Sequence, residues 1–292
     1  MDKRKISVIE IWIAAVKPWL LPVLMVATGC LPEPLDVNGI PVVKPEIVVS
    51  TQIIPDQSLV VFLTKTFGAL DASNNSDPQS LLDQIAVNDA SVSVTGPTGT
   101  YHLRRLDNGL YGGLAIPFEA GEEYELKIIS ESLGEVTAVT TVKPKLSFEA
   151  IKAELYYTGF DDTMAQVTYR FKDTIGKNWY MLNVQHIEGD ELLEDILNPN
   201  AFIRLVDDES FDGQKYGESF RVFPRDFTPG DTISVSLSNI SEDYYDFMQL
   251  RLDNRFSFIE YLSEPINYPS NIKGGKGFFN LYVPDIRLFI LE

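Results

Sequence analysis

Cysteine and histidine are scarce in this sequence, and their scarcity narrows its chemistry. A single cysteine among 292 residues cannot form an intramolecular disulfide bond or a structural zinc site of the cysteine type. The two histidines, His102 and His186, fall in different predicted strands, where an ordinary surface or structural role is expected. The sequence also lacks a Gly-x-Ser-x-Gly elbow, a Walker-type phosphate loop and a His-Glu-x-x-His motif. We therefore expect no catalytic activity, although a serine–histidine pair assembled from distant segments would leave no such motif.

Positive charge is also in short supply. The chain has 24 Lys and Arg against 42 Asp and Glu, which gives a formal net charge of −18. Removal of residues 1–29 would take away four basic and two acidic residues and so change this charge to −20. Such an excess repels a phosphate backbone, and no basic stripe offsets it, so nucleic acid is not expected as a partner. Solubility is the ordinary explanation of the acidity.

A long apolar run is missing as well. Residues 1–5 are basic overall, and the charge-free stretch beyond Lys17-Pro18, Trp19–Ala27, spans only nine residues. A transmembrane helix needs about 20 mostly apolar residues, whereas the core of a signal peptide needs about 7–15. Residues 1–29 are therefore predicted to be a signal peptide. An uncleaved anchor helix is the alternative.

The position of the only cysteine supports an export signal of a particular kind. Small residues precede it in Val26-Ala27-Thr28-Gly29-Cys30, which resembles the lipobox of bacterial lipoproteins, with Ala27 where leucine is usual. In that pathway the cysteine thiol receives a diacylglyceryl group and the chain is cut before it. We therefore predict lipidation at Cys30, with an incidental cysteine as the alternative. Four prolines in residues 31–45 keep the following stretch extended, so residues 30–45 are predicted to be a tether.

From Glu46 the sequence becomes a series of short segments rich in β-branched residues. Strands are predicted at residues 47–54, 58–64, 90–95, 100–106, 110–116, 123–130 and 135–142. Turn signals such as Gly96-Pro97-Thr98-Gly99 and Asp107-Asn108-Gly109 separate them, and a short helical turn is expected near residues 80–85. Seven short strands in roughly a hundred residues predict an immunoglobulin-like β-sandwich over residues 46–145.

The second half, residues 146–292, has a similar pattern with one helix added. Strands are predicted at residues 153–158, 164–172, 179–187, 201–207, 218–224 and 232–237, and strand-like character at 278–291. A helix is expected from Ser241, its N-cap, to about Leu262, and a shorter one at residues 189–197. The predicted fold is thus mainly β: an N-terminal immunoglobulin-like β-sandwich followed by a second β-rich domain with one substantial helix.

Carboxylates and aromatic side chains offer candidate sites, each with an ordinary alternative. Asp161-Asp162 and the group Asp207, Asp208, Glu209 and Asp212 carry oxygen ligands of the kind that Ca²⁺ takes. Their spacing matches no EF-hand, solvated loop charge is the simpler explanation, and neither a metal nor a cofactor is predicted. Aromatic pairs gather in the second half, where they would either stack on sugars and partners or pack in a core. These pairs are Tyr156-Tyr157, Trp179-Tyr180, Tyr244-Tyr245 and Phe278-Phe279.

The most distinctive segment is Pro-Ser-Asn-Ile-Lys-Gly-Gly-Lys-Gly-Phe-Phe at residues 269–279. Its three glycines permit positive φ or a close approach of two backbones. The segment is either a tight structural loop that returns the chain to a sheet or a rim that meets a partner or ligand. The candidate rim consists of Asn271, Gly274, Gly275, Gly277, Phe278 and Phe279.

This segment resembles the C-terminal motif of an uncharacterised bacterial lipoprotein family, the domain of unknown function 4249. The resemblance extends over nearly the whole mature chain, with further agreement at Pro45–Val49, Asp212-Gly213, Pro229-Gly230-Asp231 and Asp243-Tyr244-Tyr245. It departs at Asn280, where a small residue is expected. The resemblance implies an outer-membrane lipoprotein, often encoded near TonB-dependent receptors, with no catalytic residues.

The leading hypothesis is a non-enzymatic accessory lipoprotein, anchored in the outer membrane through Cys30, that binds a ligand or a TonB-dependent receptor. It would face either the periplasm or the outside. One alternative is a glycan-binding surface lipoprotein that uses the aromatic side chains. The other is a hydrolase of extracellular polymers, which would need two carboxylates, or a serine with His186, within hydrogen-bond reach in a cleft.

Overall fold

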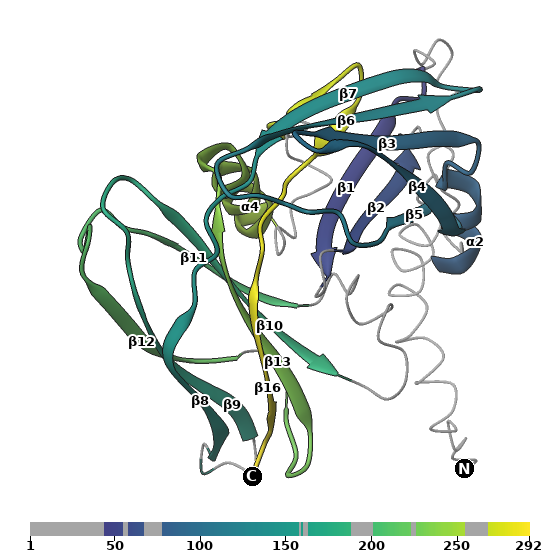
Figure 1. The fold of residues 1–292 in the computed structure, drawn as a ribbon. Coiled ribbons are helices and arrows are strands. Elements are labelled where there is room, and N and C mark those ends of the chain that lie inside the picture. Colours follow the sequence, from purple (N-terminus) through teal and green to yellow (C-terminus); the bar gives the residue numbers. More distant parts are fainter. Residues whose placement is uncertain are drawn as a thin grey trace, which may run out of the picture. The chain divides into compact units, whose positions relative to one another are not determined.

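The structure is a computed structural model, shown in Figure 1. It describes residues 44–54, 58–66, 78–157, 159, 163–187, 201–222, 226–254 and 268–292. The chain divides into two units, Met1–Val42 and Val43–Glu292, and every described residue belongs to the second. The predicted signal peptide, Cys30, nearly all of the tether and the predicted helix at 189–197 therefore lie outside the described residues.

The first domain is a sandwich of seven strands with the alternation that the sequence predicts. In β6, for example, Tyr124, Leu126 and Ile128 are buried while the residues between them face outward. A helix, α2 (Pro78–Ile85), stands between the second and third strands. The strands are β1 (Ile47–Ile54), β2 (Ser58–Lys65), β3 (Ala90–Gly96), β4 (Gly99–Asp107), β5 (Leu110–Gly113), β6 (Glu123–Ser130) and β7 (Gly134–Thr141).

The strand order of this domain is that of an immunoglobulin-like sandwich. Its strands form one hydrogen-bonded series, β7-β6-β3-β4-β5-β2-β1, which divides at β4 into a sheet β5-β2-β1 and a sheet β4-β3-β6-β7. β4 joins them, because residues 99–103 pair with β3 and residues 104–107 pair with β5. Gly109 makes the turn between β4 and β5 with a φ of +66°. The prediction of an immunoglobulin-like sandwich in the first half is confirmed.

The second domain repeats the same strand order with new strands. Its sheets are β12-β9-β8 and β11-β10-β13-β16, and all of their pairs are antiparallel. The sequence prediction of a β-rich second domain is confirmed, and the structure shows that this domain is itself a sandwich. The strands are β8 (Phe148–Tyr157), β9 (Thr163–Lys172), β10 (Trp179–Ile187), β11 (Phe202–Asp207), β12 (Lys215–Arg221), β13 (Thr232–Ile240) and β16 (Asp285–Ile290).

Between β13 and β16 the chain makes an insertion that carries one helix and two short strands. The helix α4 (Glu242–Asn254) begins as predicted, because Ser241 Oγ accepts a hydrogen bond from the Tyr244 N–H at 3.3 Å. The predicted extension of this helix beyond Asn254 lies outside the described residues. The strands β14 (Ile272–Lys273) and β15 (Lys276–Phe278) follow. None of the helices in the described ranges has the length and apolar character that a membrane crossing requires.

The insertion changes the simple division of the chain into two halves. The described residues form two large hydrophobic cores, one built mainly on β1–β7 and the other on β8–β13 with β16. Ile272, Phe279 and Leu281, however, are buried in the first core. β14 pairs with β7 and β15 pairs in parallel with β1, so the yellow C-terminal ribbon runs beside the first domain in Figure 1. Residues from the late part of the chain thus complete the first sandwich.

Candidate functional site

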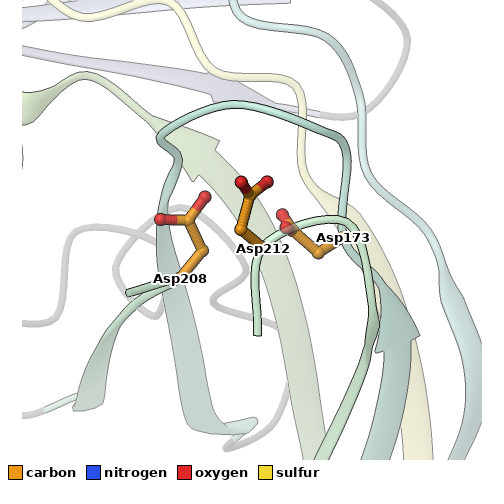
Figure 2. Close-up of side chains that lie close together, drawn as sticks. All are labelled: Asp173, Asp208 and Asp212. Atoms are coloured by element: carbon orange, nitrogen blue, oxygen red, sulfur yellow. The ribbon is translucent and has the colours of Figure 1, made fainter. Parts of the chain in front are cut away.

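The structure brings three aspartates together at one end of the second sandwich. Asp173 directly follows β9, Asp208 directly follows β11, and Asp212 lies in the turn that leads into β12. One carboxylate oxygen from each lies within 4.8 Å of those of the other two. Figure 2 shows the three side chains close together. Asp173 and Asp208 are buried and Asp212 is exposed. We call these three residues the aspartate cluster.

Asp173 connects a core tyrosine to the neighbouring turn. The Tyr180 hydroxyl donates to one of its oxygens, and the Gly213 N–H donates to the other at 2.7 Å. Burial, with the hydrogen bond to Asp173 as the next cause, raises the pKa of Tyr180. The hydroxyl therefore stays protonated and remains a donor to Asp173.

Asp208 and Asp212 hold the loop between β9 and β10. The Asn178 N–H donates to Asp208 Oδ2 at 2.7 Å, and the Gly176 N–H donates to Asp212 Oδ1 at 2.9 Å. The Asn178 side chain adds donor contacts to the carbonyls of Thr174 and Gly176 within the same loop. The aspartate cluster therefore fastens this loop to the turn between β11 and β12.

The donor set of the cluster suits a hard cation, but three carboxylates are fewer ligands than such an ion needs. Ca²⁺ takes about six to eight oxygens, and each aspartate here already accepts at least one hydrogen bond. None of the ion pairs formed within the described part of the chain includes a member of the cluster. Backbone and side-chain donors therefore balance these negative charges, and the geometry accounts for the cluster as a loop fastener.

Sequence reasoning found two of the three members. Of the acidic group at residues 207–212, the structure brings Asp208 and Asp212 together, whereas Asp207 accepts a hydrogen bond from the Glu209 N–H at 3.1 Å and lies outside the cluster. Asp173 was missed because it comes from a strand of the opposite sheet. Its position immediately after a predicted strand was the available signal. Asp161 and Asp162 lie outside the described residues.

The glycines of the candidate rim pack against the first domain. A Cβ atom on Gly277 would lie 2.0 Å from the Val49 carbonyl oxygen, and one on Gly275 would lie 2.6 Å from that of Ile47. At Gly274 the corresponding distance to the Glu135 carbonyl oxygen is 3.1 Å. Gly274 and Gly277 also have positive φ, +85° and +94°. Each glycine thus permits a close approach of two backbones.

The other residues of the candidate rim are also held by contacts within the chain. The Asn271 side chain donates to the Phe279 carbonyl at 2.7 Å and accepts from the Phe279 N–H at 2.8 Å, while Phe278 and Phe279 are buried. Asn280, the departure from the expected pattern, is also buried, and the Thr51 hydroxyl contacts its backbone N–H and carbonyl at 2.8 and 3.0 Å. These contacts are those of a structural loop, and binding of a partner by this segment stays a prediction.

The histidines and aromatic pairs occupy unremarkable positions. His102 is exposed on β4, and His186 Nε2 lies 3.7 Å from Asp231 Oδ2. Most aromatic rings of the second half are packed against one another in the interior, for example Phe171 against Tyr180 at 4.8 Å between ring centroids. Tyr157 is the most exposed aromatic side chain among the described residues, at 64%.

Comparison with known proteins adds a family to this description. A model of the domain of unknown function DUF4249 matches residues 33–285. The chain belongs to this family. The matched range takes in the first sandwich, the insertion between β13 and β16, and the second sandwich as far as Asp285, the first residue of β16. Among curated proteins, none matches the sequence.

Three solved structures resemble the chain at low identity. A segment of two fibronectin type III domains from chicken tenascin has 13% identity and a TM-score of 0.21 and covers 84% of this chain and 98% of its own. Tp47, the 47-kilodalton lipoprotein of Treponema pallidum, has 15% identity and a TM-score of 0.31 over 66% of this chain and 48% of its own. An alpha-2-macroglobulin from Salmonella has 12% identity and a TM-score of 0.20 and covers 89% of this chain and 16% of its own. All three TM-scores lie below 0.5, so the assignment of the fold rests on the strand order itself.

Proposed function

We propose that this DUF4249 protein is a non-enzymatic lipoprotein of the outer membrane that serves as an accessory to a TonB-dependent receptor in nutrient uptake. The observation that carries the proposal is the place of the only cysteine. Cys30 follows a short apolar segment that ends in small residues and precedes a stretch with four prolines at residues 31–45. The first strand begins at Ile47, shortly after that stretch. A lipid on Cys30 would therefore hold the folded body on a short extended tether.

The two-sandwich body supports a binding role more than a catalytic one. The cluster of chemistry-bearing side chains that the described residues form, the aspartate cluster, is engaged in fastening two loops. A hydrolase would need carboxylates free to act on a substrate in a cleft, with one of them able to exchange a proton. Asp173 and Asp208 are instead buried and already accept hydrogen bonds from fixed donors. We therefore rank hydrolysis behind binding.

A glycan-binding role also has less support than a protein partner. Sugar recognition by stacking requires aromatic faces open to solvent. Of the paired aromatic residues, Tyr180 and Phe278 are buried and Tyr244 packs against Phe278 with ring centroids 5.3 Å apart. Tyr157 offers one exposed ring at the end of β8. Tyr268 is 37% exposed as well, but its ring packs against Phe247 with centroids 5.8 Å apart, so few aromatic faces among the described residues are open for stacking.

The test is a pulldown from membranes of the native host, with the protein tagged at its C-terminus. Gentle crosslinking and detergent extraction would precede mass spectrometry, and a Cys30→Ala variant would be run beside the unchanged protein. We expect recovery of one TonB-dependent receptor with the unchanged protein and its loss with Cys30→Ala. The intact mass of the purified protein would show in the same sample whether Cys30 carries acyl chains. A lipidated protein recovered without any receptor would contradict the receptor role, and an unlipidated one would contradict the anchor.

A further inference from the structure

The first sandwich has one side that its own seven strands leave open. In the strand order β5-β2-β1 and β4-β3-β6-β7, the strands β1 and β7 are the last of their sheets. The outer edge of such a strand presents unpaired N–H and C=O groups unless something covers it. Here β15 covers β1 through the pairs Val48↔Lys276, Val49↔Gly277 and Ser50↔Phe278. β14 covers β7 through the pairs Ile272↔Ala138 and Lys273↔Thr137.

The segment that forms β14 and β15 is fitted closely to this side. A side chain at residue 277 would collide with the Val49 carbonyl, so β15 can approach β1 only because Gly277 lacks a Cβ. After β15, Phe279 and Leu281 are fully buried in the core of the first sandwich. The Thr51 hydroxyl holds both backbone groups of Asn280. Residues 272–281 are therefore an integral part of the first sandwich.

Both ends of the insertion join strands of the second sandwich. The insertion leaves from β13 and returns to β16, and these strands pair with each other from Thr232↔Ile290 to Leu237↔Asp285. Their pairing does not involve β14 or β15, so the second sandwich has a complete set of seven strands without the insertion. At the base of the insertion, the rings of Tyr244 and Phe247 from α4 lie 5.3 and 5.2 Å from that of Phe278.

We infer that the insertion is a strap by which the second sandwich closes the first, and that the dependence runs in one direction. The first sandwich needs residues 272–281 to cover β1 and β7 and to fill its core. The second sandwich uses none of these residues in its sheets. Loosening of the strap therefore opens the β1 and β7 side of the first sandwich and leaves the second sandwich folded.

Hydrogen exchange of the full-length protein, followed by mass spectrometry, tests this inference. The variant Gly277→Ala introduces the collision with Val49, and Gly230→Ala is its matched control. Gly230 has nearly the same φ, +98° against +94°, but a Cβ there would meet nothing within 4 Å. We expect exchange to accelerate at least about tenfold in residues 47–54 and 134–141 of Gly277→Ala, with β10 and β13 unchanged. Gly230→Ala should leave β1 and β7 protected.

Two results would contradict this inference. Equal loss of protection in both sandwiches would show that the body opens as one unit, and unchanged protection of β1 and β7 would show that the first sandwich does not need β14 and β15. If Gly277→Ala fails to fold, Thr51→Val gives the same test in a milder form. It removes the hydroxyl that binds Asn280 while it nearly preserves the volume of the side chain. The same selective acceleration in β1 and in residues 276–281 is then expected.

Discussion

The two sandwiches of this protein share one strand order and differ in how their open sides are closed. In the first, β4 passes from one sheet to the other, β15 covers β1 and β14 covers β7, so its strands form one continuous series. In the second, β11, β12, β8 and β16 remain the last strands of their sheets within the described residues. The same order therefore yields one closed sandwich and one with free edges.

In the second sandwich, β11 and β12 occupy the places that β4 and β5 have in the first. β11 and β12 do not pair, and side chains connect them instead. Arg204 on β11 makes a two-pronged ion pair with Glu218 on β12, and the hydroxyls of Tyr169 and Tyr216 both donate to Glu218 at 3.3 Å. Burial first, and then the neighbouring groups that include Glu218, raise the pKa of both tyrosines, so both stay protonated. Side chains span a gap that backbone pairing closes in the first sandwich.

The opposite sides differ in exposure. β7 lies under β14, whereas β16 carries Leu288 and Ile290 with 69% and 66% of their surface exposed. An uncovered strand with outward apolar residues is prone to pair with another chain. The comparison therefore identifies the second sandwich as the half with the freer edges, and the following predictions test the two modes of closure.

The largest effect is expected where β4 and β5 close the first sandwich. Gly109→Ala should lower the free energy of unfolding by about 3 kcal/mol, because the φ of +66° disfavours a side chain and the added Cβ would lie 2.4 Å from the Leu63 carbonyl oxygen. Gly121→Ala is the control, with a φ of +87° and open space around the Cβ. Urea unfolding of both variants measures the difference. Equal losses would mean that the collision at the β4–β5 turn contributes nothing.

A smaller effect is expected from the side-chain bridge of the second sandwich. Glu218→Gln should cost about 1–2 kcal/mol, since four donors lose a charged acceptor that is only partly exposed. A double-mutant cycle with Arg204→Met separates the ion pair from the tyrosine hydrogen bonds. Near-zero coupling between the two substitutions would show that the tyrosines, and not Arg204, hold Glu218.

The sequence predicted those features that neighbouring residues determine. Alternation of apolar residues gave all seven strands of the first sandwich, and the serine followed by acidic residues gave the start of α4, because both signals are local. The return of residues 272–281 to the first sandwich was not predicted. Ile272 pairs with Ala138, more than a hundred positions earlier, and no local pattern encodes such a pairing. The glycines marked a close backbone approach but could not name Val49 as the partner.

The aspartate cluster divides in the same way, and it supplies a third prediction. Asp208 and Asp212 were found as one acidic segment, but their contact with Asp173 depends on packing between sheets.

With EDTA present, Asp173→Asn should lower the free energy of unfolding by about 1–2 kcal/mol, because a buried acceptor of the Tyr180 and Gly213 donors loses its charge. Asp212→Asn should be neutral or stabilising by about 0.5 kcal/mol, because the side chain is exposed, asparagine keeps an oxygen that accepts from the Gly176 N–H, and the loss of charge relieves like-charge repulsion. Thermal unfolding decides, and a larger loss for Asp212→Asn than for Asp173→Asn would show that the exposed carboxylate, and not the buried one, carries most of the fastening.

The smallest effects concern one carboxylate in each sandwich whose pKa is lowered for a different reason. Burial alone would raise the pKa of Asp89, but hydrogen bonds from Ser132 and Ser130 outweigh it. The hydrogen bond from Lys215 lowers the pKa of Glu149, with the charges of Lys215 and Arg170 assisting. A lowered folded-state pKa means that each contribution to stability is present above the ordinary range of the carboxyl and is lost as the pH falls through the folded pKa.

Salt should separate these two causes. NMR titration in about 1 M NaCl is expected to return the pKa of Glu149 toward its ordinary value, because salt screens exposed charges, and to leave that of Asp89 low. Ser130→Ala should raise the pKa of Asp89 at either salt concentration, and Lys215→Met should raise only that of Glu149. An equal shift of both pKa values in salt would show that nearby charges, and not the serine hydrogen bonds, lower the pKa of Asp89. The contrast between local dipoles in the first sandwich and surface ion pairs in the second would then be wrong.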